Sequence, residues 1–170
     1  MAESIGERMS PKVVTIANTA GGSAKTTIAH ALTVATVEYG KKTLLIDCDP
    51  KASLTFRVGR EGTRLSLADF LSGTSIRSED LDSHAERFDF IAADSRLAAN
   101  SDEGALTQLL TKLPKDYDLV ILDTPSTLTP ALGASIGAAD QILAPVSQSL
   151  HSLRGLIQIR KITDKPITAV

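Results

Sequence analysis

The sequence has 170 residues, of which 42% are hydrophobic and 22% charged, and its formal net charge is -2. This length suffices for one domain with a real hydrophobic core, and the near-neutral charge excludes a strong overall positive field that would attract DNA or acidic lipid. Aromatic residues make up only 4% of the chain. The core must therefore consist mainly of Leu, Ile, Val and Ala, which is typical of a parallel sheet covered by helices.

The single cysteine, Cys48, cannot form an internal disulfide or a cysteine-based metal site. No apolar run approaches the roughly 18–20 residues of a membrane span, so we expect a cytoplasmic protein with no membrane partner. Residues 1–11 are polar and carry no signal-peptide core. They are expected to form a flexible leader before one domain that covers residues 12–170.

Short apolar runs and helical patterns alternate along the rest of the chain. In chain order they predict a strand at 12–17, a helix at 25–39 that ends at Gly40, a strand at 43–47, a short helix at 66–71 stopped by Gly73, a strand at 88–92, a helix at 102–113 with an acidic first turn, a strand at 118–122, a helix at 129–139, a strand at 141–145, a helix at 152–162 and a strand at 166–170. Residues 58–87 have the weakest pattern and are interpreted as a surface excursion or a mobile segment.

This alternation predicts βαβ units and a doubly wound, mostly parallel α/β sheet with helices on both faces. In such sheets a ligand binds beyond the carboxyl ends of the strands. The residues that follow the predicted strands are therefore the first candidates for a functional site.

The first candidate is the loop that joins the first strand to the first helix. Such a loop wraps backbone N–H groups around an anion at a helix N-terminus, and a lysine neutralises the charge. Its candidate phosphate-binding residues are Gly21, Gly22, Ser23, Ala24, Lys25, Thr26 and Thr27. The pattern G-x-x-x-x-G-K-[ST] is not met, because Thr19 and Ala24 stand where its glycines belong. The plainer alternative is a Gly-Gly turn before a helix capped by threonine.

Acidic residues follow two other predicted strands. Asp47 and Asp49 flank Cys48 directly after the second strand, and Asp123 follows the run 118–122. Carboxylates there can bind Mg²⁺, directly or through water, or position a water that attacks a phosphate. Thr26, Asp47, Asp49 and Asp123 are therefore candidates for binding magnesium or positioning the attacking water, and Lys25 is the candidate contact to the outer phosphates. The alternative is a strand-ending turn at each position.

Other polar residues carry weaker signals. His30, His84 and His151 are scattered without metal-ligand spacing and are interpreted as structural or surface residues. The basic residues of the last helix could contact a DNA backbone, although a solvated face is the favoured interpretation. These residues are Arg154, Arg160 and Lys161.

Taken together, these motifs resemble the ParA/MinD family of deviant Walker-motif ATPases, which are P-loop proteins. The loop 18–27 corresponds to the family's Asn-x-Lys-Gly-Gly-x-Gly-Lys-Thr stretch, and Asp47-Cys48-Asp49-Pro50 to its Asp-x-Asp-Pro. Asp123-Thr124-Pro125 corresponds to its Asp-x-Pro, and 139–146 to its Ala-Asp…Pro-Val strand. The similarity covers most of residues 12–170, and the family usually continues beyond this point.

The resemblance implies ATP or ADP and Mg²⁺ as cofactors. It implies that Lys25 binds the phosphates, that Thr26 and Asp123 serve the magnesium, that Asp49 supports attack by water and that Asp47 is a neighbouring acidic residue. It also implies a homodimer formed around nucleotide, a ParB-like stimulating partner and non-specific, nucleoid-associated DNA binding. The function implied is the partition or positioning of plasmids, chromosomes or other cargo.

Two departures from the family pattern leave a second hypothesis open. Ala20 replaces the signature lysine, which in the family reaches the partner subunit's phosphates, and Ala24 replaces a glycine before Lys25. If the backbone at Ala24 requires a positive φ, alanine adds strain there. The alternative to a weak ATPase is therefore a degenerate module that binds nucleotide or a partner with little or no hydrolysis.

Overall fold

A computed structural model describes residues 10–99, 102, 104–113 and 116–170. Its strands are β1 (Lys12–Ile16), β2 (Thr43–Asp47), β3 (Asp82–Ser83), β4 (Asp89–Ile91), β5 (Leu119–Asp123), β6 (Gln141–Ala144) and β7 (Ile167–Ala169). Its α-helices are α1 (Lys25–Glu38), α2 (Ser53–Arg57), α3 (Leu67–Leu71), α4 (Ala105–Thr111), α5 (Pro130–Ala138) and α6 (Leu150–Ile162). Two 3₁₀ turns lie at Ser78–Asp80 and Ser95–Ala99.

The strands form one sheet in the order β3-β4-β2-β5-β1-β6-β7. All neighbouring pairs in this order are parallel except the first, in which the short β3 pairs with β4 in the antiparallel sense. β2, β4 and β3 lie on one side of β1 and β6 and β7 on the other, and β5 is inserted between β1 and β2. The expected doubly wound, mostly parallel α/β fold is confirmed.

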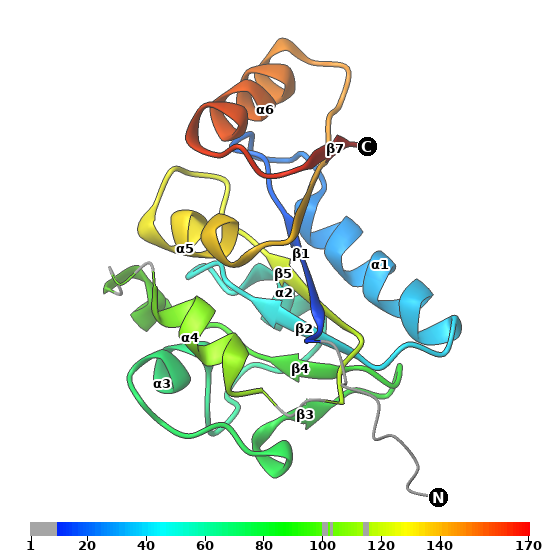
Figure 1. Cartoon of the computed structure of the whole chain (residues 1–170), viewed down its shortest axis with the longest axis vertical. Helices are drawn as coiled ribbons and strands as arrows, with labels where there is room; N and C mark the ends of the chain where they lie inside the picture. Colours follow the sequence, from blue (N-terminus) through cyan, green and yellow to red (C-terminus); the bar gives the residue numbers. More distant parts are fainter. Residues whose placement is uncertain (1–9, 100–101, 103, 114–115) are drawn as a thin grey trace, which may run out of the picture.

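Helices cover both faces of the sheet (Figure 1). Alternate residues of the strands divide between the core clusters on these two faces. On one face Leu45 and Ile121 pack with α1 and α2. On the other face Leu44 and Val120 pack with α3, α4 and α5. A smaller cluster joins α5 and α6 around β6. This division follows from the period of two in a strand, which turns successive side chains to opposite faces.

The structure corrects three details of the sequence interpretation. The segment 58–87 is more than a surface excursion, because Leu67, Phe70 and Leu81 from it are buried in the core. The helix expected at 102–113 begins at Ala105, and Asp102 precedes it with a carboxylate that accepts a hydrogen bond from the Gly104 N–H at 2.8 Å. Helix α2 and strand β3 were not predicted, since five and two residues are too short for a periodic signal.

Two further expectations concern the N-terminal residues and the membrane. The leader expected at 1–11 lies outside the described residues apart from Ser10 and Pro11. Among the described residues, no helix combines the length and apolar character needed to cross a membrane.

Candidate nucleotide site

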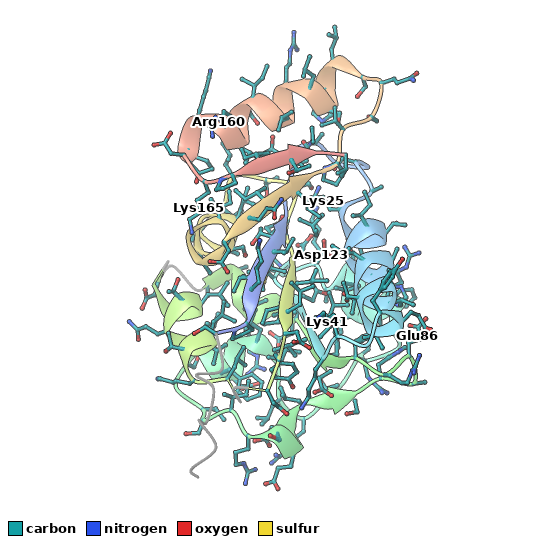
Figure 2. All side chains as sticks on the ribbon, turned by 45° about the vertical axis from the view of Figure 1, so that its right-hand side comes forward. Lys25, Lys41, Glu86, Asp123, Arg160 and Lys165 are labelled. Atoms are coloured by element: carbon teal, nitrogen blue, oxygen red, sulfur yellow. The ribbon has the colours of Figure 1, made fainter. Side chains whose placement is uncertain are left out.

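Three neighbouring strands bring the predicted site residues to one edge of the sheet. β5 lies between β2 and β1, and Asp123 is in register with Asp47 on one side and Ile16 on the other. Ile16 ends the strand that leads into the glycine loop, so the loop and both carboxylates meet in one row. Figure 2 shows Lys25 and Asp123 at this edge, with Lys41 further along the sheet.

The loop after β1 ends in a strained residue. Ala24 precedes α1 with φ 66° and ψ 19°, the left-handed region, and Gly22 also has a positive φ of 70°. The backbone at residue 24 therefore has the positive φ at which an alanine adds strain and a glycine would not. No side chain caps α1. The first N–H groups of this helix, which lack intrahelical partners, are thus free for an anion.

Lys25 turns back over this loop. Its ammonium donates to the Ala20 carbonyl at 3.0 Å and to the Ser23 hydroxyl at 3.3 Å, and the residue is only 7% exposed. Burial lowers the pKa of Lys25, while the charges of Asp123 and Asp49 act against that shift. The lysine therefore lies between the loop and the two acidic residues, where a phosphate group would be neutralised.

Asp123 is a buried carboxylate without a hydrogen-bond partner. It is 1% exposed, and neither oxygen meets a donor among the described residues. Burial raises the pKa of Asp123 to about 7. The nearby Thr26 hydroxyl and the Lys25 charge act against this rise, although neither group forms a hydrogen bond with the carboxylate, and the charge of Asp47 adds to it. A buried charge without a partner is costly, so this side chain is suited to a ligand that brings positive charge.

The residues present fit a magnesium ion that arrives with a nucleotide. Mg²⁺ in nucleotide sites takes only one or two protein oxygens and completes its shell with phosphates and water. The Asp123 carboxylate and the Thr26 hydroxyl supply such oxygens. The described residues contain no cluster of three or more His, Cys, Asp or Glu that could hold a metal ion.

Asp47 is engaged in holding the turn after β2. One of its carboxylate oxygens accepts from the Asp49 N–H at 3.0 Å, and the other from the Thr55 N–H at 2.9 Å and the Thr55 hydroxyl at 2.8 Å. Burial raises the pKa of Asp47 to about 6, against these hydrogen bonds. A role for Asp47 at the magnesium stays a prediction, whereas its contacts show that it positions the segment that carries Asp49.

Asp49 is the more accessible of the two aspartates. It is half-buried, and its Oδ1 accepts from the Lys51 N–H at 3.0 Å. The negative charge of Asp49 acts to raise the pKa of Lys25, against the effect of burial. A carboxylate so placed can accept a hydrogen bond from a water beside a phosphate.

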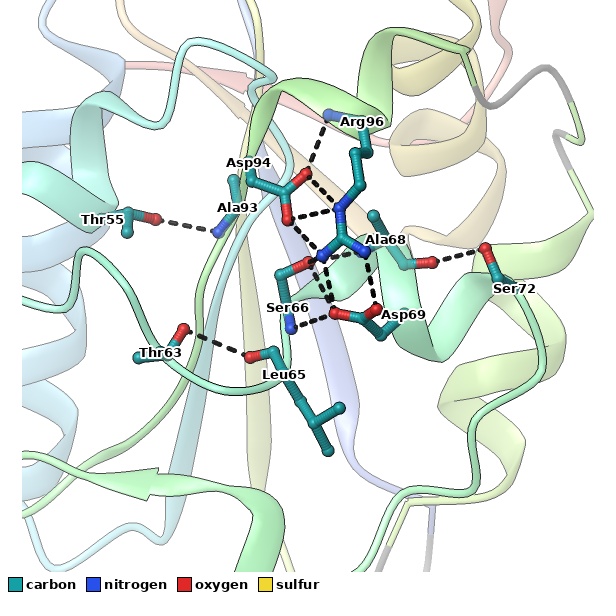
Figure 3. A network of polar contacts seen from close by, with 10 residues as sticks. All are labelled: Thr55, Thr63, Leu65, Ser66, Ala68, Asp69, Ser72, Ala93, Asp94 and Arg96. Atoms are coloured by element: carbon teal, nitrogen blue, oxygen red, sulfur yellow. Dashed lines mark hydrogen bonds and ion pairs between the residues drawn. The ribbon is translucent and has the colours of Figure 1, made fainter.

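A pair of hydrogen bonds that sequence reasoning missed connects this turn to the segment just after β4. The Thr55 hydroxyl, which donates to Asp47, also accepts from the Ala93 N–H at 2.9 Å. One residue further on, Asp94 shares the Arg96 guanidinium with Asp69 (Figure 3). This arginine holds the pKa of Asp69 down to about 2. The ends of β2 and β4 are thus tied together through Thr55.

A second missed feature is the close contact between the loop and α6. Asn18 is fully buried; its amide donates to the Pro145 carbonyl at 2.7 Å, and its Oδ1 accepts from the Ala20 N–H at 2.8 Å. A Cβ on Gly155 would lie 1.9 Å from that Oδ1. Only glycine lets α6 approach the loop so closely. The available signal was a glycine inside a helical pattern.

The remaining candidates take no part in this site. Cys48 is buried, and burial raises the pKa of its thiol, so it is packed rather than reactive. His30, on α1, and His84 both contact Glu86, at 2.8 and 3.3 Å. His151 and the basic residues of α6 are exposed. The latter are Arg154, Arg160 and Lys161.

Comparisons of the sequence and the fold show which known proteins this chain is similar to. The sequence profile of the AAA domain family (AAA_31) matches residues 11–169. The maintenance of carboxysome distribution protein A of Synechococcus elongatus is 33% identical over 155 residues, which cover 85% of this chain and 62% of that protein. The chromosome-partitioning ATPase Soj of Thermus thermophilus is 32% identical over 146 residues, covering 84% and 57%. The chain thus spans about three fifths of the length of these relatives.

Solved structures agree with the sequence relatives. The apo McdA protein of Cyanothece superposes with a TM-score of 0.83 at 28% identity, covering 94% of this chain and 71% of that one. Cobyrinic acid a,c-diamide synthase of Mycobacterium smegmatis, solved with ADP and magnesium, gives 0.79 at 28% identity, covering 94% and 72%. The chain therefore belongs to the AAA domain family, as a ParA/MinD-like P-loop protein.

Proposed function

We propose that this chain binds ATP with Mg²⁺ and hydrolyses it slowly to ADP and phosphate, as a ParA-like ATPase acting in the partition or positioning of a plasmid, chromosome or other cargo. The observation that carries the proposal is the orphaned carboxylate of Asp123, which is buried beside Lys25 and the uncapped start of α1. A buried anion, a cation and free N–H groups at one sheet edge suit a magnesium–polyphosphate ligand better than a simple anion.

In this proposal each site residue has a distinct role in binding or hydrolysing the nucleotide. The backbone N–H groups of 21–27 hold the phosphates, Lys25 exchanges its contacts with Ala20 and Ser23 for phosphate oxygens, and Asp49 orients the attacking water. Thr26 and Asp123 would hold the magnesium ion, which when bound neutralises charge that develops on the phosphates. Asp47 keeps the segment of Asp49 in place through Thr55.

The relatives support the choice of ligand. The Mycobacterium synthase has been solved with ADP and magnesium and also with an ATP analogue and magnesium, and a variant of Cyanothece McdA has been solved with ATP. These proteins are 27–28% identical to this chain over 94–95% of its length. The family profile matches residues 11–169, a range that includes the loop and both acidic strand ends.

Assembly belongs to the same proposal. A nucleotide-dependent homodimer, a ParB-like stimulating partner and non-specific DNA binding would complete a ParA-type cycle. Ala20 offers no cation to a partner subunit, so we expect a weaker nucleotide-dependent dimer than a lysine there would give. Molecular mass measured by light scattering with and without Mg-ATP tests this part separately.

A degenerate binding module remains the second candidate. The strained backbone at Ala24 and the missing cation at Ala20 favour it. Steady-state phosphate release by the pure protein, with Asp49→Ala as the blank, separates the two. Release above the blank supports the ATPase, whereas release equal to the blank with intact binding supports the module.

The site itself is tested by Mg²⁺-dependent ATP binding, measured by titration calorimetry. Lys25→Ala is expected to abolish binding, because it removes the buried cation over the loop. Lys41→Ala, which removes an exposed lysine beside the N-terminal end of β2, is the matched control and should bind as the wild type does. Equal ATP affinity in the Lys25→Ala variant and the wild type would refute the assignment.

A further inference from the structure

An arginine from the segment after β2 lies against the phosphate loop. Arg57 ends the short helix α2, and its Nη1 donates to the Thr27 hydroxyl at 3.0 Å. Thr27 belongs to the first turn of α1, so this contact places a guanidinium beside the N–H groups that are free for an anion. α1 and α2 are in contact along this side.

Arg57 differs from four other arginines of the chain in the kind of partner it has. Arg64, Arg77, Arg87 and Arg96 each form an ion pair with an aspartate or glutamate. Arg57 instead donates to a neutral hydroxyl, and no carboxylate partner for it is found within the described part of the chain. Its side chain is exposed. A guanidinium of this kind has both charge and donors available for a phosphate.

We propose that Arg57 is a phosphate-binding residue of the nucleotide site, contacting a phosphate that ADP and ATP share. The inference rests on the proposed function and adds a residue to it. The shared phosphates are chosen because the backbone of a phosphate loop, to which Thr27 belongs, holds the α- and β-phosphates, whereas the lysine reaches the outer ones. Binding then needs only a side-chain rotation of Arg57 away from the Thr27 hydroxyl.

The alternative is that Arg57 merely ties α2 to α1. The two roles differ in what a substitution changes. A tie contributes to the stability of the free protein and leaves nucleotide affinity alone. A phosphate ligand contributes to affinity, and its contribution weakens as salt screens the charge of an exposed group.

The experiment is titration of Mg-ADP into the full chain at low and high ionic strength, because ADP avoids turnover during the measurement. Arg57→Ala is expected to weaken ADP binding by roughly tenfold, the effect of losing one charge-assisted hydrogen bond, and to reduce the salt dependence of binding. Arg57→Lys should recover part of the affinity, since it keeps the charge but loses the planar fork. Arg64→Ala, which removes an exposed arginine paired with Asp80, is the control for net charge and should match the wild type.

Each outcome decides between the proposals. ADP affinity of Arg57→Ala equal to that of the wild type refutes the phosphate role of Arg57 and leaves the proposed function standing. A thermal midpoint lowered in the free Arg57→Ala protein without a change in affinity assigns it to the tie. A wild type that binds no ADP, ATP or non-hydrolysable analogue refutes the proposed function, and the inference fails with it.

Discussion

Replacing Ala24 with glycine should stabilise the protein, although glycine ordinarily destabilises a helix. Ala24 has φ 66° and ψ 19° and immediately precedes α1. An L-residue in the left-handed region carries about 1–2 kcal/mol of strain, which glycine relieves. Glycine also gives the unfolded chain more freedom, at a cost of about 0.4–1 kcal/mol. The difference predicts a net gain of about 0.5–1 kcal/mol.

The gain can be measured by thermal and urea unfolding of the free protein. For a chain of this size it corresponds to a rise of about 1–4 °C in the midpoint temperature. Ala52→Gly should behave in the same way, because Ala52 precedes α2 with φ 53°. Ala35→Gly is the contrasting control: Ala35 is exposed inside α1, and glycine there should cost about 1 kcal/mol.

The sign of the change is what tests the reasoning. If Ala24→Gly lowers the midpoint as Ala35→Gly does, then the left-handed conformation at residue 24 is not strained in the native state. In that case Ala24 would not raise the conformational energy of the loop. Backbone strain at this residue would then no longer support a degenerate site.

Three further substitutions probe the contacts around the site. Gly155→Ala places a methyl group against the Asn18 side chain and should cost about 1–3 kcal/mol, as measured by urea unfolding; an unchanged midpoint would mean that α6 shifts freely. Thr55→Val leaves the buried Ala93 N–H without its acceptor and should cost about 1–3 kcal/mol, while Thr55→Ser should retain most of the stability. Asp123 has its pKa raised from an ordinary 3.8 to about 7, so the native state holds its proton longer than the unfolded state and this group lowers stability as pH rises from about 4 to 7. Asp123→Asn should therefore raise the free energy of unfolding at pH 8 by at least about 1 kcal/mol and lose that gain near pH 4. Nucleotide binding by this variant should not depend on Mg²⁺. A variant less stable than the wild type at pH 8 would contradict this reasoning.

The sequence predicted the sheet well because its strands are short, apolar and bounded by clear stops. β1, β2 and β5 appear within about one residue of their expected ends, and the rule that ligands lie beyond the carboxyl ends of parallel strands then located Lys25, Asp49 and Asp123. The position of Asp123 beside Asp47, by contrast, can be predicted only when the order of the strands in the sheet is known. The order is a property of long-range pairing, which local patterns do not encode.

The contacts that hold the site together were out of reach for a different reason. Thr55 joins Asp47 to Ala93 across 38 residues of chain, and Asn18 reaches Pro145 across 127. Each is a single polar side chain at an ordinary position, and its role depends on the partner that folding brings near. The same holds for Arg57, whose contact with Thr27 spans 30 residues and leaves no periodic trace.

These contacts change the meaning of the loop's departures from the family pattern. Ala20 is 2% exposed, its carbonyl accepts from Lys25 and its N–H donates to Asn18. The side chain of a lysine at this position would start from a buried backbone, whereas the exposed guanidinium of Arg57 already contacts the first turn of α1. If Arg57 does bind phosphate, positive charge has moved from the loop to α2. The charge of Arg57 then binds the nucleotide of its own subunit, and the absence of a lysine at position 20 weakens only the contact between subunits.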